Sequence, residues 1–345
     1  MALNFDFHNR LGKGHFGEVW LVTDTGLNTK RALKLIPSDK LFNPQNMFHE
    51  AQILKEAEHP NVIHVEETGQ MSDGRIYVAM EYLEKGSLED EAKGGYVDLT
   101  RAKRIMIDVL RGLEHAHSKN ILHRDIKPAN ILIGNNCEGV LSDFGLAIPM
   151  DIDLIELGIK DYIYILHLAP ELYPRREYTI SSDIYAAGVT FYRLVNGDSY
   201  LPPLPRIDIR SACIQGKYPD RNKYREFIPN SVRRLINKSI NIEPTKRYQS
   251  ACEMRHAIEQ LIIEMNWSEK KLQNGFEWVC SWGDKCYQVS RIRNENNSYS
   301  INTKKGRSKT TLRNLSKYSY DQIDKKKAEK LTRQILQNFV LGKIK

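Results

Sequence analysis

The sequence predicts an α+β fold in three parts: a small, mostly β-stranded lobe (residues 1–82), a mainly helical lobe (83–265) and a small basic domain (266–345). Apolar residues in the first part alternate with the two-residue period of strands, whereas after Leu99 they recur with helical spacing. The charge balance also changes near Asn266. A chain of 345 residues is long enough for two domains of roughly 150 residues each.

Nearly all of the positive charge lies at the C-terminal end. The whole chain carries +8, but residues 266–345 hold 18 Lys and Arg against 7 Asp and Glu, while residues 1–265 are slightly acidic. A basic segment of this kind favours an acidic partner, although it is also compatible with a solvated surface. There is no long apolar run and no signal-peptide pattern, so we expect a cytoplasmic protein without membrane association.

The first lobe is predicted to contain five antiparallel strands and one helix. Apolar residues at helical spacing place the helix at 45–57, and Pro60 ends it. The strands are expected around 5–11, 18–22, 32–36, 62–68 and 76–80. In the second lobe, helices are expected at 102–117, 183–196 and within 231–263.

Three glycines lie between the first two strands, in the pattern Gly12-x-Gly14-x-x-Gly17. Glycines let backbone N–H groups approach phosphate oxygens where a side chain would intrude, although a glycine-rich hairpin turn alone would look the same. Lys34 on the third strand could reach such phosphates, and Glu50 on the following helix could pair with it.

The most informative segment is His123-Arg-Asp-Ile-Lys-Pro-Ala-Asn130. Asp125 could orient and accept the proton of a substrate hydroxyl, and Lys127 could contact the transferred phosphoryl group. Asn130, at the end of this segment, and Asp143, the first residue of an Asp-Phe-Gly motif, supply the oxygen ligands that Mg²⁺ prefers. Ala-Pro-Glu follows at 169–171.

The order of these motifs resembles that of the eukaryotic-like (Hanks-type) serine/threonine protein kinases, over roughly residues 5–262, and in particular their bacterial or phage-borne members. The resemblance implies the bilobal protein kinase fold, ATP and Mg²⁺ as cofactors, and a protein substrate. It assigns catalysis to Asp125, Lys127, Lys34 and Glu50, and metal binding to Asn130 and Asp143. The nucleotide would be held by Gly12, Gly14, Gly17, Val19, Ala32, Lys34, Met80, Glu81, Leu83 and Leu132.

The family resemblance also bears on the acceptor and on activation. Lys127 is typical of serine/threonine kinases, but Tyr164 stands where these enzymes keep a threonine. Between Gly145 and Ala169 there is no Ser or Thr, and the segment is rich in Ile and Leu. We expect it to pack against its own lobe or within a homodimer.

Two other functions fit parts of this pattern. A pseudokinase scaffold would bind partners with little turnover, but every catalytic position is present. A small-molecule phosphotransferase would share the catalytic Asp and Asn, but usually lacks both the glycine-rich turn and Ala-Pro-Glu.

The last 80 residues lie outside this resemblance. Alternating segments predict strands at 276–282, 287–292 and 299–301, followed by a helix at 321–341, so the domain is expected to be β-β-β-α. This order, with lysines at 325–327, resembles the latter part of a double-stranded RNA-binding domain. Nucleic-acid binding, protein docking or autoregulation, and a solvated basic surface all remain open.

Overall fold

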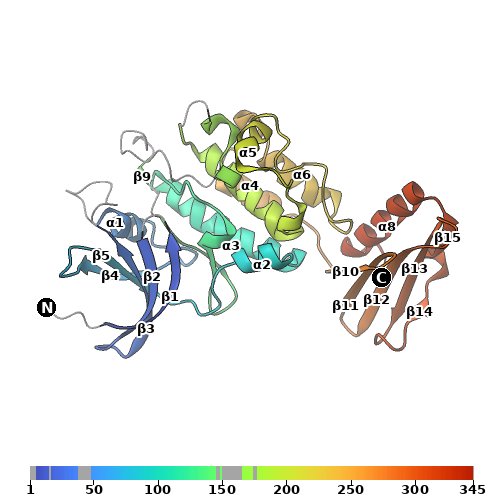
Figure 1. Cartoon of the computed structure of the whole chain (residues 1–345), viewed down its shortest axis with the longest axis horizontal. Coiled ribbons are helices and arrows are strands. Elements are labelled where there is room, and N and C mark those ends of the chain that lie inside the picture. The colour runs from blue at the N-terminus through green and yellow to red at the C-terminus, as the bar shows by residue number, and fades with distance from the viewer. Residues whose placement is uncertain are drawn as a thin grey trace.

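The computed structural model describes residues 5–14, 17–37, 48–144, 148–149, 165–173 and 177–344. Figure 1 shows, from left to right, a mainly β-stranded N-terminal lobe, a helical C-lobe and a C-terminal sheet with one helix, which we call the C-terminal domain. The predicted α+β class is confirmed.

The N-lobe is a five-stranded antiparallel sheet with one helix, as predicted. Its strands follow the order β1-β2-β3-β5-β4, and the helix α1 spans His49–Glu56. The strands are β1 (Phe5–Gly14), β2 (Gly17–Asp24), β3 (Thr29–Ile36), β4 (Val65–Gln70) and β5 (Ile76–Glu81). Because β4 begins later than expected, Val62 is left to form an isolated bridge to Leu141 in the C-lobe.

The alternation of β3 gives the sheet two different faces. Leu33 and Leu35 are buried in a small cluster on one face. Lys34 lies on the other face, where β3 pairs it with Val19 and Val78. Since cross-strand partners share a face, the same register places Ala32 beside Met80. The sheet therefore directs one lysine and several apolar side chains toward the C-lobe.

The C-lobe is built around α4 (Ile180–Asn196), which is buried over most of its length. The other helices are α2 (Glu89–Gly94), α3 (Leu99–Ser118), α5 (Arg206–Ile214), α6 (Asn230–Ser239) and α7 (Ala251–Glu259). Two short antiparallel pairs flank the catalytic segment, β6 (Ile121–Leu122) with β9 (Ile148–Pro149) and β7 (Ile131–Ile133) with β8 (Gly139–Leu141). The region 231–263 divides into α6 and α7 because the turn at Pro244–Lys246 interrupts the helix.

The C-terminal domain has six strands and one helix. Its strands are β10 (Ser268–Leu272), β11 (Gly275–Trp282), β12 (Lys285–Arg293), β13 (Tyr299–Gly306), β14 (Arg313–Asn314) and β15 (Tyr320–Ile323), and its helix is α8 (Lys325–Val340). The strand order is β10-β11-β12-β13-β14, with β15 also pairing with β13.

The three strands predicted from alternation are confirmed, and three more were missed. β10 carries charges at consecutive positions, so its sequence does not alternate, and β14 and β15 are very short. The predicted helix start at residue 321 was wrong, because β15 extends to Ile323 and Asp324 caps α8 by accepting from the N–H of Lys327. No helix precedes the sheet in this domain, so the likeness to a double-stranded RNA-binding domain does not extend to the fold.

The C-terminal domain packs directly on the C-lobe. The hydroxyl of Tyr96 donates to the carbonyl of Trp267, and Arg225 forms a buried ion pair with Glu269 at 2.6 Å. A single apolar core runs from the C-lobe into the domain. The division into 1–265 and 266–345 therefore stays a proposal about domains whose cores are continuous.

Among the described residues, no helix combines the length and the apolar character needed to cross a bilayer.

Candidate active site

One wall of the site is the face of the N-lobe sheet that carries Lys34. Lys34 is largely buried there, and its ammonium Nζ lies 2.8 Å from Oδ1 of Asp143 in the C-lobe. Met80 and Leu83 are also buried, while Val19, Ala32 and Leu132 are half-buried. The N–H of Glu81 donates to the carbonyl of His64. The side chain of Glu50, on α1, lies outside the described residues.

The glycine-rich turn joins β1 to β2, with Gly14 opposite Gly17. Gly17 has a φ of +141°, and a Cβ there would lie only 2.0 Å from the carbonyl oxygen of Leu35. At Gly12 and Gly14, by contrast, a Cβ would meet no neighbour within 4 Å. Close packing therefore demands glycine only at the third position, and open space surrounds the other two.

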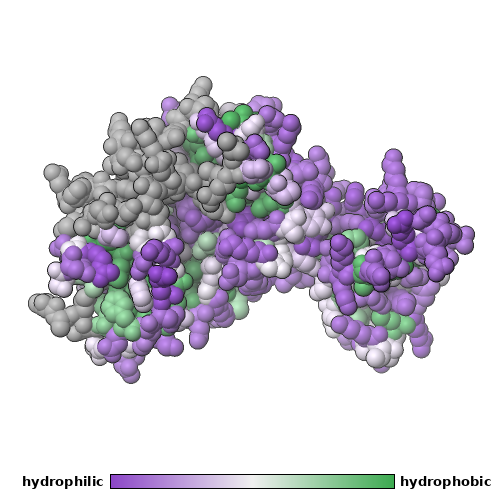
Figure 2. All heavy atoms as spheres, in the orientation of Figure 1, coloured by the Kyte–Doolittle hydropathy of each residue, from purple (hydrophilic) through white to green (hydrophobic). Residues whose placement is uncertain are grey.

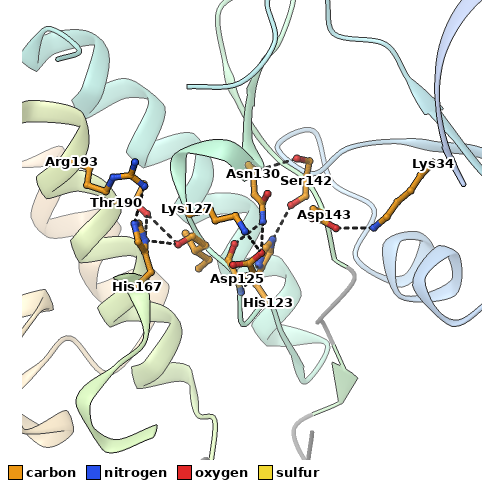
Figure 3. A network of polar contacts seen from close by, with 11 residues as sticks. Lys34, His123, Asp125, Lys127, Asn130, Ser142, Asp143, His167, Thr190 and Arg193 are labelled. Atoms are coloured by element: carbon orange, nitrogen blue, oxygen red, sulfur yellow. Dashed lines mark hydrogen bonds and ion pairs between the residues drawn. The ribbon is translucent and has the colours of Figure 1, made fainter. Parts of the chain in front are cut away.

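The catalytic segment brings Asp125, Lys127 and Asn130 together (Figure 3). Oδ2 of Asp125 lies 2.6 Å from the ammonium of Lys127 and 3.0 Å from the amide nitrogen of Asn130. Burial raises the pKa of Asp125 to about 6, against the opposing effect of Lys127. Its proton affinity is thus higher than that of an ordinary aspartate, which suits a proton acceptor.

Asp143 faces this group from the start of the Asp-Phe-Gly segment. Its φ is +60°, a left-handed conformation that a non-glycine residue adopts at a cost, often at functional sites. Burial alone would raise the pKa of Asp143, but the ammonium of Lys34 outweighs it and holds the pKa below its ordinary value. Asp143 is therefore kept ionised, whereas Asp125 takes up a proton at a higher pH.

The back of the catalytic segment is held by Asp183 on α4. Its carboxylate accepts the N–H groups of His123 and Arg124 at 2.9 and 2.8 Å, and Nε2 of His117 lies 2.9 Å away. Arg124 has a φ of +67°, so these charge-assisted bonds hold a strained backbone. Burial raises the pKa of Asp183. The hydrogen bond and charge of His117, together with the hydrogen bonds from the backbone, outweigh this effect, so the pKa is lowered.

A second network behind the segment was not predicted from the sequence (Figure 3). Nδ1 of His167 lies 2.8 Å from the carbonyl oxygen of Ile126, which also accepts the hydroxyl of Thr190 at 3.3 Å. On the other side, Nη1 of Arg193 donates to Nε2 of His167 at 3.2 Å. Burial, with the nearby Arg193 charge, holds the pKa of His167 well below its ordinary value.

The Arg193 guanidinium is almost completely buried and also pairs with Glu89 and Asp198. The neutral His167 therefore connects this cation to the backbone between Asp125 and Lys127. The only sequence signal was a single arginine in the mainly apolar second half of α4.

Two further contacts involve the Ala-Pro-Glu and Asp-Phe-Gly motifs. Both terminal nitrogens of Arg247 lie 2.7 Å from the carboxylate of Glu171, in the Ala-Pro-Glu motif. Phe144 is fully buried and packs edge-on against His123. Most of the segment from Gly145 to Tyr164 lies outside the described residues, so the roles of Tyr164 and of the Ile-rich stretch, including a homodimer contact, stay predictions.

The donor set suits a nucleotide with a divalent cation. The amide nitrogen of Asn130 donates to both the carbonyl and the side chain of Asp125, which leaves its oxygen as an acceptor for a cation. A carboxylate and an amide oxygen are hard ligands of the kind that Mg²⁺ prefers.

Comparison with known proteins agrees with this geometry. Residues 5–260 match the protein kinase domain family. The chain belongs to the protein kinase family.

Several curated relatives are serine/threonine kinases. The chain is 28% identical over 267 residues to the serine/threonine-protein kinase PrkC of Bacillus subtilis, covering 76% of this chain and 41% of the relative. It is 34% identical over 266 residues to calcium-dependent protein kinase 3 of Plasmodium yoelii yoelii, covering 73% and 48%. It is 30% identical over 278 residues to a probable myosin light chain kinase of Dictyostelium discoideum, covering 76% and 84%. The chain thus spans less than half of the length of the first two relatives.

Proposed function

We propose that the protein transfers the γ-phosphate of ATP to serine or threonine hydroxyls of proteins. The observation that carries the proposal is the pairing of two aspartates with different electrostatics: Asp125, with its raised pKa, and Asp143, kept ionised by Lys34. One suits the acceptor hydroxyl and the other suits the cation on the donor.

Each residue has a distinct role in this proposal. Asp125 accepts the proton of the attacking hydroxyl, and Lys127, 2.6 Å from it, neutralises charge that develops beside it. Lys34 and the N–H groups of the glycine-rich turn hold the phosphates. Asn130 and Asp143 would hold Mg²⁺, which when bound supplies charge neutralisation on the phosphates.

The serine/threonine preference rests on Lys127 and on the relatives. In the structure, Lys127 belongs to the same hydrogen-bonded group as Asp125 and Asn130. The relatives whose printed names include serine/threonine-protein kinase match over the region that contains this group.

The test is incorporation of labelled phosphate from ATP into generic proteins and into a cell lysate, with phosphoamino acid analysis of the products. We expect phosphoserine and phosphothreonine, and incorporation by the Asp125→Asn variant that is lower by about 10²–10⁴. Nucleotide binding without incorporation would favour a scaffold, and labelling of small molecules alone would favour a small-molecule phosphotransferase.

We also propose that the C-terminal domain is a fixed binding module. It is joined to the C-lobe at Tyr96, Thr100 and the segment 225–228. Figure 1 shows it at the end of the C-lobe away from the N-lobe, so it does not cover the interlobe cleft. This placement favours partner binding over autoinhibition by occlusion.

A further inference from the structure

The outer edge of the C-terminal sheet carries an unbalanced positive charge. Between Tyr299 and Tyr320 there are six basic residues and no acidic residue. We call these six side chains the distal basic edge: Lys304, Lys305, Arg307, Lys309, Arg313 and Lys317. All except Lys305 are exposed.

The fold gathers these residues in one place. β13 pairs Lys304 with Asn314 and Lys305 with Arg313, so both sides of the connecting loop carry cations. The loop lies close to the strand at Gly306, where a Cβ would be 2.5 Å from the carbonyl oxygen of Thr311. The cations are therefore concentrated at one end of the sheet rather than spread along an extended chain.

The ion pairs between this domain and the C-lobe show how the protein treats charges that serve packing. Arg225 pairs with Glu269 of β10 and Arg291 of β12 pairs with Glu226, and all four side chains are at least half-buried. Within the described part of the chain, none of the six residues of the distal basic edge forms an ion pair with a carboxylate. Lys305 lies over the ring of Tyr287 at 5.5 Å and Lys317 lies over that of Tyr318 at 5.6 Å, but these contacts leave the positive charge of the edge unbalanced.

Among the described residues, the ion pairs between the C-lobe and the sheet lie on strands other than β13 and β14. Glu269 of β10 pairs with Arg225, and Arg291 of β12 pairs with Glu226, whereas β14 lies two strands beyond β12 in the sheet order. Two strand spacings amount to roughly 10 Å, which is comparable with the screening length of about 8 Å at physiological salt. Figure 2 shows hydrophilic residues over most of the outer end of the domain.

The chemistry of the edge favours phosphate groups over an acidic protein. Protein interfaces usually have apolar or aromatic anchors at their centre. The exposed large hydrophobic residues of the described chain are Phe7, Leu11, Leu27, Ile214 and Ile262, all before residue 266. Short hydroxyl and amide side chains lie between the cations instead: Ser308, Thr310, Thr311, Asn314 and Ser316. Such groups, with Lys and Arg, make most contacts to a nucleic-acid backbone.

We propose that the distal basic edge binds the phosphate backbone of a nucleic acid without reading its sequence. Three tyrosines lie beside it, and none offers an exposed ring as a stacking platform for bases, because Tyr287 is buried and Tyr318 and Tyr320 pack against the domain core. This proposal specifies the partner of the binding module proposed above, but it does not depend on phosphotransfer.

The lysines at the start of α8 are a separate group. They follow β15, which pairs with the Tyr299 end of β13, whereas Lys304 and Lys305 lie toward its other end. The carboxylate of Asp324 already caps α8, so the helix start does not require an external anion. These lysines therefore provide an internal comparison within the same domain.

The test is fluorescence anisotropy with the full chain, without ATP, at 50 and 200 mM salt. The labelled probes are a 20-base-pair RNA duplex, a DNA duplex of the same sequence, and poly-glutamate. The edge variant combines Lys304→Glu, Arg307→Glu and Arg313→Glu. A control variant with the same charge change combines Lys30→Glu, Lys119→Glu and Lys217→Glu, and a third variant changes Lys325 and Lys326 to Glu.

We expect the unaltered chain to bind both duplexes, with affinity falling steeply with salt. The edge variant should bind at least tenfold more weakly. The slope of the logarithm of the binding constant against the logarithm of the salt concentration should decrease in magnitude by about three, roughly one for each altered residue. The control and α8 variants should change affinity by less than about threefold. Phosphorylation of a generic protein and the urea midpoint should be unchanged in the edge variant, which shows that it is folded.

Three results would overturn the proposal: negligible binding of the duplexes, equal losses in the edge and control variants, or binding of poly-glutamate as tight as that of the duplexes. The last result would identify an acidic protein as the partner. A preference between the RNA and DNA arms would support the proposal and identify the natural nucleic acid. Because no ATP is used, the result does not depend on whether the kinase proposal holds.

Discussion

The aspartates at the front and at the back of the catalytic segment have pKa values that are shifted in opposite directions. Asp125, at the front, is less buried, yet its pKa is raised to about 6. Asp183, at the back, is almost completely buried, yet its pKa is lowered. The difference lies in the donors: Asp183 accepts two backbone N–H groups and faces His117, whereas Asp125 has side-chain partners only. The number of hydrogen-bond donors, rather than the degree of burial, therefore distinguishes Asp183, which supports the segment, from Asp125, which is the proposed proton acceptor.

The largest effect is expected from Asp125→Asn. The amide keeps the shape of the side chain but cannot accept the proton, so phosphate incorporation should fall by about 10²–10⁴. Nucleotide affinity, measured by titration with a fluorescent ATP analogue, should stay within about threefold. Lys34→Ala is the matched comparison, because it should weaken both phosphate incorporation and productive nucleotide binding. Turnover at the unaltered rate in Asp125→Asn would show that another group is the base.

The next effect is expected at the back, from Asp183→Asn. The neutral side chain loses the charge in two hydrogen bonds, each worth about 1.5–3 kcal/mol when charged, so the free energy of unfolding should fall by roughly 3 kcal/mol. Activity should also fall at least tenfold, because the strained backbone at Arg124 is no longer held. Urea unfolding and kinetics at saturating ATP measure the two effects. An unaltered urea midpoint would contradict the supporting role of Asp183.

A third prediction concerns the buried cation behind Ile126. Arg193→Met leaves Glu89 and Asp198 without their buried partner, and breaking such a pair costs about 3–5 kcal/mol. Because Asp198 is itself partly exposed, the lower end of this range is expected. Asp198→Asn is the control, since it retains Arg193 and its contact to His167. If the two variants have the same urea midpoint and the same turnover, the link from Arg193 to the catalytic segment is unimportant.

The smallest effect is on pH dependence. Since Asp125 must be ionised to accept a proton, kcat/KM should fall about tenfold for each pH unit below about 6. The folded state binds this proton more tightly than the unfolded state, so ionisation of Asp125 lowers stability as pH rises from about 4 to about 6. Asp125→Asn should remove that part of the pH dependence of unfolding. An acid limb of kcat/KM near pH 4 would show that the environment of Asp125 is ordinary.

The sequence predicted the parts of this comparison that depend on motifs. Short fixed spacings place Asp125, Lys127 and Asn130 on one turn. Lys34 and Asp143 are 109 positions apart, and the sequence identified them by their own motifs and not by spacing. The support from His167 and Arg193 could not be predicted, because these residues are 26 positions apart and meet only through the packing of α4.

The C-terminal domain was predicted less completely for a related reason. Alternation identified its central strands, β11, β12 and β13, because one face of each is buried. It did not identify β10, whose charged residues lie at the sheet edge, or the short β14 and β15. The docking of the domain through Arg225 and Glu269 depends on a pairing between residues 44 positions apart, and neither residue belongs to a recognisable motif.

The buried junction also sets how the two halves of the protein can be used. Arg225 lies over the ring of Tyr96 at 4.0 Å, and the hydroxyl of Tyr96 donates to the carbonyl of Trp267, so the family match, which ends at residue 260, stops short of a packed junction. Cutting the chain at that point would expose apolar surface on both the C-lobe and the C-terminal domain. The intact junction holds the outer sheet edge at a set distance from the cleft. The packed junction therefore fixes the position of the C-terminal sheet on the C-lobe, which a flexible linker would not do.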